Sequence, residues 1–385
     1  MRDFLFKDAQ KMRYVENATR ELALLYGYEE VITPVVESYE LLAAKAGEEI
    51  RLRMYAFDDL SGRKVALRPE FTPSIARLVA TKFKNAPKPL RLFSVGSLYR
   101  YDEPQYGRFR EFWQANYELV GSNKPEADAE ILTVCGDLLS KLGLRNYHIK
   151  IGHMGILRGI LSQEGITEDL QNKIMQLLDK KRWEEALKLI QELGASQKCH
   201  ATLKNLIQTA GEDTGEILRR IRQSVKDFED AVVALENLRQ ILDLTKNSGV
   251  EFEVLIEAGF ARGLEYYTGI VFESYVPELG IALGGGGRYD KLIELFGGEP
   301  TPSVGVALGI DRIVLAMKKQ KLSPKLSEQR RVVVIPLKEE MRAKTCELAF
   351  TLRQSGIVAE VEVMGRAVSK ALSDADRRGF YFSVL

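Results

Sequence analysis

The stretch YRYDEPQYGRFREFWQANYELVG, residues 99–121, predicts two strands joined by a charged turn. Its Pro-Gln-Tyr-Gly turn is surrounded by Arg100, Arg108 and Arg110. Planar guanidinium groups make forked, charge-assisted hydrogen bonds, and three of them on one hairpin suit a polyphosphate ligand. Asp102 and Glu103 suit either ion pairs with these arginines or a part in placing Mg²⁺. From the residues alone, an exposed hairpin with internal salt bridges is an equally good interpretation.

The second strand of this stretch carries an unusual row of polar residues. Alternate side chains of a strand face opposite ways, so Gln114, Asn116 and Glu118 share one face with Phe112 and Val120. Read alone, this row favours the solvated face of an antiparallel sheet. The alternative is a polar floor that hydrogen-bonds a ligand.

A second informative stretch is ARGLEYYTGIVFESY, residues 261–275. Read as a strand, it places Tyr267, Gly269 and Glu273 on one face, and the small glycine leaves room beside the Tyr267 ring. That room indicates either a bend in a sheet or the floor of a pocket. Tyr266 falls on the other face and is expected in the core.

The glycine run at residues 284–287 matches neither the P-loop nor the dinucleotide-binding pattern. Taken alone it predicts a tight turn or a bulge that allows close approach of the backbone. Arg288 and Tyr289 follow it directly.

The pattern of the chain divides it into parts. Strand and helix patterns occupy residues 1–154 and return at 248–320. Between them, residues 155–247 have helical spacing, many Lys/Glu pairs and no strand signal, which predicts a helical insertion. Residues 319–330 are polar and predict a linker. Residues 327–385 alternate strand and helix, which predicts a small α/β domain with parallel strands. The alternation ends on a strand at Leu385, so this domain is expected to be incomplete.

Composition narrows the class of protein. The 385 residues are 45% hydrophobic and 28% charged with a net charge of +1, so nucleic-acid binding must rely on local basic patches. The widely spaced Cys135, Cys199 and Cys346 predict neither a disulfide framework nor a zinc site. A charged N-terminus without an apolar segment, and no long apolar run elsewhere, predict a cytoplasmic protein with no signal peptide and no membrane span.

Together these segments resemble the class II aminoacyl-tRNA synthetases, and specifically the histidyl-tRNA synthetase family, over nearly the whole chain. YGYEEVITPVVES is similar to motif 1, residues 99–121 to motif 2, and VGVALGIDRIVLAM to motif 3. RGLEYYTGIVFE and GGGGRYDKL resemble the histidine-specific signatures, and LRPEFTPSIAR resembles the amino-acid-binding loop. Six ordered matches are highly specific.

The resemblance implies a fold and a set of partners. The fold class is α+β, an antiparallel sheet flanked by helices, with a helical insertion and a C-terminal α/β anticodon-binding domain. The implied reaction converts histidine and ATP to histidyl-adenylate and pyrophosphate, and then transfers histidine to the 3′ end of tRNA(His). Mg²⁺ and a homodimer, through motif 1 and Pro34, are implied as well.

The resemblance also assigns roles to single residues. Glu70 and Thr72 would hold the α-ammonium of histidine, Gln114 would orient its carboxylate, and Glu118 and Tyr267 would recognise its imidazole nitrogens. The implied histidine-binding set is Glu70, Thr72, Gln114, Glu118, Tyr267 and Tyr289. The implied ATP-binding set is Arg100, Asp102, Arg108, Phe112 and Arg312, with Phe112 and Arg312 on either side of the adenine. Arg262 and Arg100 would be the catalytic pair at the α-phosphate, and no protein metal ligand is assigned.

Two residues depart from the family pattern, and two other functions compete with this one. Asp102 stands where the family has a glutamate, and Asn116 where a small residue is common. The main alternative is the catalytically inactive regulatory subunit of ATP phosphoribosyltransferase, which shares the fold but generally lacks an equivalent of Arg262. Specificity for threonine or proline requires a zinc site or a small apolar pocket, which the Glu118 and Tyr267 pair does not fit.

Overall fold

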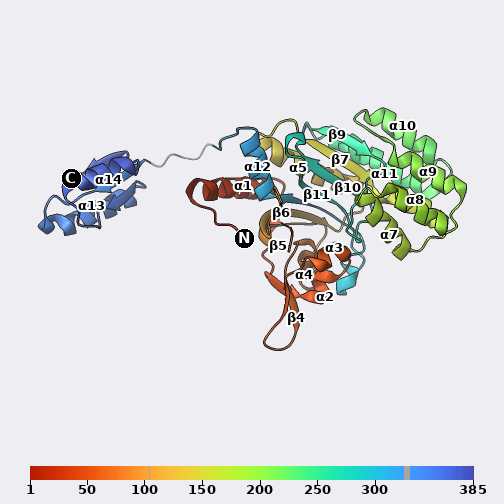
Figure 1. Cartoon of the computed structure of the whole chain (residues 1–385), viewed down its shortest axis with the longest axis horizontal. Coiled ribbons are helices and arrows are strands. Elements are labelled where there is room, and N and C mark those ends of the chain that lie inside the picture. Colours follow the sequence, from red (N-terminus) through yellow and green to blue (C-terminus); the bar gives the residue numbers. More distant parts are fainter. Residues whose placement is uncertain (104, 325–329) are drawn as a thin grey trace. The chain divides into compact units, whose positions relative to one another are not determined.

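A computed structural model describes residues 1–103, 105–324 and 330–385. The chain forms two compact units, Met1–Pro324 and Lys325–Leu385 (Figure 1). Of the predicted linker at 319–330, residues 325–329 lie outside the described residues, as does the predicted domain start at 327, and Lys319 belongs to a helix that ends there. The other predicted domain boundaries lie within the first unit and stay predictions.

A nine-stranded sheet with the order β1-β5-β6-β12-β11-β10-β7-β9-β8 forms the centre of the first unit. Neighbouring strands are antiparallel except for the pairs β1–β5 and β7–β9. A separate small sheet has the order β2-β4-β3. The predicted antiparallel sheet is confirmed. The strands of the unit are β1 (Glu29–Glu30), β2 (Val36–Ser38), β3 (Ala56–Asp58), β4 (Lys64–Leu67), β5 (Leu90–Tyr99), β6 (Glu111–Val120), β7 (His148–His153), β8 (Ala210–Gly211), β9 (Glu253–Glu257), β10 (Ile270–Tyr275), β11 (Ala282–Arg288) and β12 (Ser303–Gly309).

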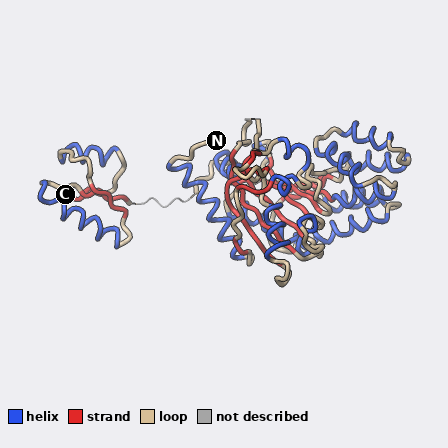
Figure 2. Tube along the Cα trace, turned by 90° about the horizontal axis from the view of Figure 1, so that it is seen from below, coloured by secondary structure: helices blue, strands red, loops and turns tan. Residues whose placement is uncertain are grey.

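Helices lie against this sheet and extend beyond one end of it (Figure 2). They are amphipathic, so each buries an apolar side, as Ile131, Val134 and Leu138 of α5 do. The α-helices of the unit are α1 (Phe6–Leu25), α2 (Tyr39–Ala43), α3 (Gly47–Leu52), α4 (Thr72–Lys82), α5 (Pro125–Lys141), α6 (Met154–Gln163), α7 (Glu168–Asp179), α8 (Trp183–Glu192), α9 (Gln197–Ile207), α10 (Thr214–Val225), α11 (Glu229–Lys246) and α12 (Ile310–Lys319). Short 3₁₀ turns span η1 (Pro277–Leu279) and η2 (Glu294–Phe296).

The predicted helical insertion is present as α6–α11, with one correction. Residues 155–247 were predicted to lack strands, but Ala210 and Gly211 form β8, which pairs with Ile256 and Glu257 of β9 at the edge of the main sheet. A pair of residues is too short for a period-2 pattern to be visible in the sequence. The insertion also shares one continuous hydrophobic core with the sheet, since Ile174 and Leu203 belong to the same buried cluster as Ile149.

The strand predicted at 261–275 begins later than expected. Residues 261–269 form a loop, and β10 starts only at Ile270. The segment from Gly263 to Gly269 is not part of a strand. Alternation between two faces of a strand therefore does not determine where the Tyr266 and Tyr267 side chains lie. No helix of the described residues is both long and apolar enough to cross a membrane.

The second unit confirms the predicted α/β alternation. Its strands β13 (Arg331–Val334), β14 (Val358–Val361) and β15 (Phe382–Val384) form a parallel sheet in the order β14-β13-β15. Its helices are η3 (Glu339–Met341), α13 (Arg342–Gln354) and α14 (Val368–Arg377). Val332 and Val334 pack with Ala349 of α13, whereas Val333 and Ile335 pack with Ala371 and Ala375 of α14. The two helices therefore cover opposite faces of the sheet (Figure 2).

Candidate active site

A pocket of about 310 Å³ opens over the face of the nine-stranded sheet. Its walls come from β6, β10, β11 and β12, the β5–β6 turn, the starts of α3 and α4, the loop before β10, and α7. The pocket brings together every site residue predicted from the sequence: Glu70, Thr72, Arg100, Asp102, Arg108, Phe112, Gln114, Glu118, Arg262, Tyr267, Tyr289 and Arg312. The row of Gln114, Asn116 and Glu118 therefore faces this pocket, and the solvated interpretation is wrong.

The floor of the pocket is a run of glycines in a regular strand. Gly284–Gly287 all lie in β11, between β10 and β12, so the predicted turn is wrong, whereas the β10–β11 pairing does shift register at the start of the run, between Ala282 and Gly284. These glycines provide space. A Cβ at Gly285 would lie 2.6 Å from Arg262 Nη1, and one at Gly287 would lie 2.9 Å from the Tyr267 ring. On β12, a Cβ at Gly305 would come within 1.7 Å of Glu118 Oε2.

Glu118 is the most completely enclosed carboxylate of the site, only 1% exposed. Thr72 Oγ1 and Asn116 Nδ2 each donate to its Oε1 at 2.8 Å, and the Tyr289 hydroxyl donates to Oε2. Burial raises its pKa to about 7, while these three hydrogen bonds favour the ionised form and oppose the rise. Glu118 is therefore held in one orientation and titrates near neutral pH.

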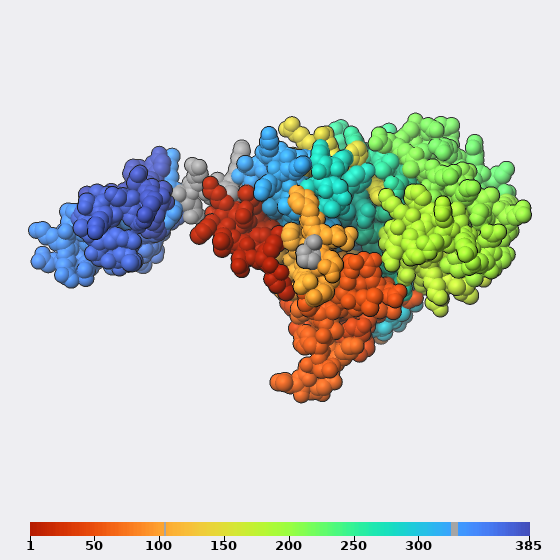
Figure 3. All heavy atoms as spheres, viewed as in Figure 1, coloured from red at the N-terminus to blue at the C-terminus, as the bar shows by residue number. Residues whose placement is uncertain are grey.

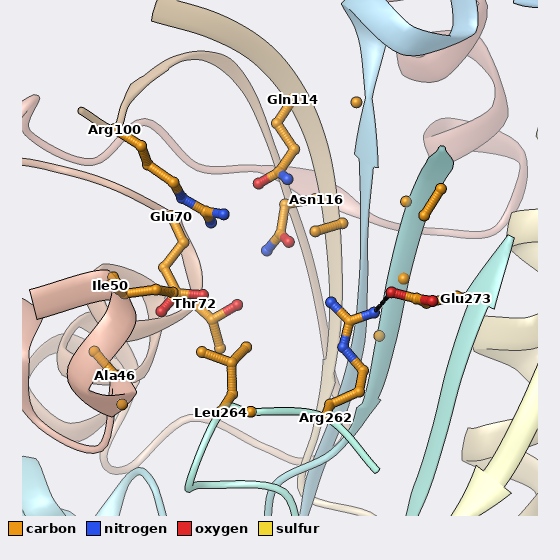
Figure 4. A pocket seen from close by; sticks show the side chains of 18 of the residues that line it. Ala46, Ile50, Glu70, Thr72, Arg100, Gln114, Asn116, Arg262, Leu264 and Glu273 are labelled. Atoms are coloured by element: carbon orange, nitrogen blue, oxygen red, sulfur yellow. Dashed lines mark hydrogen bonds and ion pairs between the residues drawn. The ribbon is translucent and has the colours of Figure 1, made fainter. Parts of the chain in front are cut away.

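Glu70 lies beside Thr72, just before α4 begins (Figure 4). Tyr266 donates to Glu70 Oε2 at 3.0 Å, whereas Oε1 is buried without a hydrogen-bond partner among the described residues. Burial raises the pKa of Glu70, and the nearby Arg100 guanidinium opposes that rise. Tyr266 was predicted to be a core residue. That prediction is confirmed, since Tyr266 belongs to the main buried cluster, and it also lines the pocket and donates to Glu70.

The side-chain oxygen of Gln114 is also buried without a partner among the described residues. Gln114 and Asn116 project from β6 toward the space that Glu70 and Thr72 approach from the other side (Figure 4). Buried polar atoms are nearly always hydrogen-bonded in folded proteins. Two orphaned acceptors that line one pocket therefore point to a ligand that carries N–H donors.

Arginines supply positive charge to the same space. Arg100 donates to the Pro69 carbonyl at 2.9 Å, and its guanidinium lies 5.3 Å from the centre of the Phe112 ring. Arg262 donates to Glu273 at 2.5 Å, and both Arg100 and Arg262 extend into the pocket (Figure 4). Burial lowers the pKa of Arg262, but Glu273 and other neighbours outweigh it and the net pKa is raised, so Arg262 stays charged.

Arg312 and Asp102 are held by their own neighbours. Arg312 donates to the carbonyls of Gly107 at 3.0 Å and Ala282 at 2.8 Å, which fixes its guanidinium at the pocket wall. Burial, followed by repulsion from Arg100 and Arg108, lowers its pKa. Asp102 accepts from Arg53 at 3.0 Å.

Some pocket residues were missed at the level of sequence. Glu273 was placed on the Tyr267 face by alternation but received no role, although it is the ion-pair partner of Arg262. Gln176, Asp179 and Lys180 of the insertion also line the pocket. Their helix reads as an ordinary amphipathic helix, and no sequence signal marks them.

Comparison with known proteins gives the same family throughout. A family model described as histidyl-tRNA synthetase matches residues 1–313, and an anticodon binding domain model matches residues 331–385. The histidine–tRNA ligase of Methanocaldococcus jannaschii is 42% identical over 382 residues, which cover 98% of this chain and 88% of the relative. The histidine–tRNA ligase of Pyrococcus abyssi is 39% identical, with 100% of this chain and 89% of the relative covered.

Solved structures agree in fold. A protein from Bacillus halodurans, described as an ATP phosphoribosyltransferase regulatory subunit/histidyl-tRNA synthetase, matches with a TM-score of 0.84 at 25% identity, covering 100% of this chain and 96% of that one. The apo S. aureus histidyl-tRNA synthetase matches with a TM-score of 0.74 at 25% identity, covering 100% of this chain and 89% of that one.

Proposed function

The chain belongs to the histidyl-tRNA synthetase family, and from that premise we propose how its pocket activates histidine. The activity itself, ATP-dependent activation of histidine and its transfer to tRNA, is that of the histidine–tRNA ligases to which the chain is similar over nearly its full length. The regulatory-subunit alternative is not favoured, because the curated relatives are ligases and Arg262 is present.

The inner part of the pocket is proposed to bind histidine. The ammonium group of histidine donates to Glu70 Oε1 and Thr72, and the Gln114 amide nitrogen donates to the histidine carboxylate. The Gln114 oxygen accepts a further N–H of the ammonium group, so both orphaned acceptors gain a donor. The imidazole lies over the glycine floor, with one nitrogen at Glu118 and the other at Tyr267. A carboxylate acceptor and a phenol match a ring with one N–H and one lone pair. Tyr289 orients Glu118 through its hydroxyl.

The outer part of the pocket is proposed to bind ATP. Phe112 and Arg312 stack on the adenine, using cation–π attraction on one side. Arg108 contacts the β- and γ-phosphates, and Arg100 and Arg262 contact the α-phosphate from two sides. The histidine carboxylate attacks the α-phosphorus in line and pyrophosphate leaves with its electron pair. Neither this step nor the transfer to the tRNA hydroxyl needs a covalent enzyme nucleophile, so catalysis consists of positioning and charge stabilisation.

Mg²⁺ is proposed to enter with ATP. The described residues contain no group of three or more metal-ligating side chains, and the pocket carboxylates Asp102 and Glu273 are each ion-paired with an arginine. That donor set fits an ion that binds mainly to phosphate oxygens and water, as Mg²⁺ commonly does, with at most one or two carboxylates such as Asp102. When bound, the ion neutralises charge on the phosphates.

We further propose a cytoplasmic homodimer that binds tRNA(His) with its second unit. The anticodon binding domain match to residues 331–385 supports the role of that unit. The motif 1 segment carries apolar side chains that are solvent-exposed in a single chain, among them Ile32 at 90% and Val36 at 45%. Exposed apolar groups that are close in sequence support an interface with a second copy. The cytoplasmic location follows from the use of charged tRNA in translation.

The observation that carries the histidine assignment is the buried Glu118, oriented by three hydrogen bonds beside Tyr267 above a floor of glycines. The test is histidine-dependent exchange of labelled pyrophosphate into ATP, measured with all twenty amino acids. We expect exchange with histidine, and we expect Arg262→Ala to abolish it while the protein stays folded. Unchanged exchange in that variant removes the role of Arg262. No exchange with any amino acid, together with binding to a phosphoribosyltransferase, restores the regulatory alternative.

A further inference from the structure

One helix of the insertion forms a wall of the pocket. Gln176, Asp179 and Lys180, at the C-terminal end of α7, line the same pocket as Arg262. The space-filling view shows the insertion (yellow-green) lying against the segment around α2 and α3 (orange) (Figure 3). The insertion is therefore part of the site, as well as part of the shared core.

The end of α7 contacts the loop that carries Arg262. Gln176 Nε2 donates to Glu265 Oε1 at 3.1 Å. A Cβ at Gly263 would lie 2.7 Å from Asp179 Oδ2, and among the described residues, its chain neighbours aside, only Asp179 would lie within 4 Å of it. Residues 262–265 thus lie against α7 through one hydrogen bond and one close approach.

The segment before and within α3 contacts the other side of this loop. The Glu265 N–H donates to the Lys45 carbonyl at 3.3 Å, and the Glu265 carboxylate lies 3.9 Å from Arg51. A Cβ at Gly47 would come within 2.8 Å of the Gly263 carbonyl oxygen. The loop is consequently enclosed between two elements that are far apart in sequence.

The helix itself is fixed at several points. Ile174, Met175 and Leu178 are buried in the core, which sets the rotation of α7. At its N-terminal end Glu168 lies 3.5 Å from Lys45 and 3.2 Å from Lys291. Exposed ion pairs of this kind contribute little to stability, so the buried face determines most of the position of α7.

We propose that Gln176 and Asp179 are positioning residues for histidine activation, which rests on the function proposed above. They hold residues 262–265 so that the Arg262 guanidinium points at the α-phosphate. Among the described residues, the main-chain N–H groups of Arg262, Gly263 and Leu264 make no hydrogen bond to the backbone, and only the Glu265 N–H does, so the position of Arg262 and Gly263 depends on side-chain contacts. A misplacement of about 1 Å at a catalytic group reduces rate by up to about 100-fold.

The test compares Gln176→Ala, Asp179→Ala, Gly263→Ala and the double variant Gly263→Ala/Asp179→Ala in the full chain. Pyrophosphate exchange gives kcat and the KM for histidine, and thermal unfolding checks the fold. Each single variant changes one of the contacts that hold the loop, so we expect a displacement smaller than about 1 Å and a loss of about ten-fold in kcat. We expect the histidine KM to change less than two-fold, because Arg262 acts on the phosphate. Lys173→Ala, an exposed position on the same helix, is the matched control and should equal wild type.

The double variant distinguishes positioning from a general loss of structure. In Gly263→Ala the new methyl displaces the Asp179 carboxylate, so Gly263→Ala/Asp179→Ala should be no slower than Asp179→Ala alone. The positioning proposal is overturned if the single variants keep the wild-type kcat, or if the losses of the two single variants multiply fully in the double variant. In either case the proposed function still stands, provided that the wild type shows histidine-dependent exchange. If one variant does not fold, the remaining variants still decide the outcome. Absence of exchange in the wild type overturns the proposed function itself.

Discussion

Gly305 offers a direct test of the glycine floor, because a single added methyl group would collide with the residue proposed to recognise imidazole. A Cβ at Gly305 would lie 1.7 Å from Glu118 Oε2 and 2.5 Å from its carboxyl carbon. Since contacts shorter than 3.0 Å essentially never occur for a real Cβ, Oε2 must move by at least about 1.3 Å in Gly305→Ala. The backbone here cannot yield easily, because Gly305 pairs with Glu118 across β12 and β6.

The size of the effect follows from the contacts that this movement breaks. Glu118 accepts from Thr72, Asn116 and Tyr289, and it cannot keep all three bonds after such a shift. Misplacing a recognition group by about 1 Å costs on the order of 100-fold, or about 2.7 kcal/mol. We therefore expect kcat/KM for histidine in pyrophosphate exchange to fall about 100-fold, while the KM for ATP changes little.

The assay needs a control for adding a methyl group to a glycine. Gly215→Ala is suitable, because its Cβ would meet nothing closer than 3.5 Å and its φ is not positive. It should leave exchange unchanged. The double variant Gly305→Ala/Glu118→Ala has no carboxylate for the new methyl group to collide with. Adding Gly305→Ala to Glu118→Ala should therefore lower the unfolding temperature by less than adding Gly305→Ala to wild type does. A folded Gly305→Ala protein with histidine kinetics within three-fold of wild type would refute the reasoning.

Two further predictions concern buried charges. Because burial raises the pKa of Glu118 to about 7, the fold favours its protonated form, and wild type should lose unfolding free energy relative to Glu118→Gln as pH rises from about 4.5 to 7. Equal slopes in urea unfolding across that range would contradict this. Asp128→Ala should cost about 3–5 kcal/mol, because it leaves Arg288 buried without its main partner at 2.7 Å. Arg182→Ala, which removes the exposed pair with Glu185, should cost less than about 1 kcal/mol by the same measurement, and similar losses in the two variants would contradict the prediction.

The parts of the fold that the sequence predicts well are those in which local pattern and tertiary environment agree. The alternation after Arg331 predicts three parallel strands, and Val332, Val333, Val334 and Ile335 do divide between the two helices that cover the sheet. The candidate site residues were found because six ordered motifs identify the family. Without the family resemblance, the row of Gln114, Asn116 and Glu118 was interpreted as a solvent-exposed face of the sheet.

The errors arise where tertiary packing overrides the local pattern. Tyr266 is buried as predicted, but it lies in a loop rather than a strand, and its hydroxyl reaches Glu70 from a distant part of the chain, a contact that alternation does not predict. The glycine run has poor intrinsic strand propensity, but its neighbours β10 and β12 supply a ladder on both sides. Gln176 and Asp179 face the pocket only because the insertion folds back onto the sheet, and no local pattern carries that information.

A floor made of main chain has a consequence for redesigning the substrate range. At Gly285, Gly287 and Gly305 an added side chain would point at the pocket residues Arg262, Tyr267 and Glu118, and no atom can be removed there, so a larger residue at any of these three positions makes the cavity shallower. Engineering toward a bulkier amino acid must therefore begin at the walls, where Tyr267 and Tyr289 contribute whole rings that can be trimmed. The backbone sets the upper limit of depth, and the aromatic walls set the width.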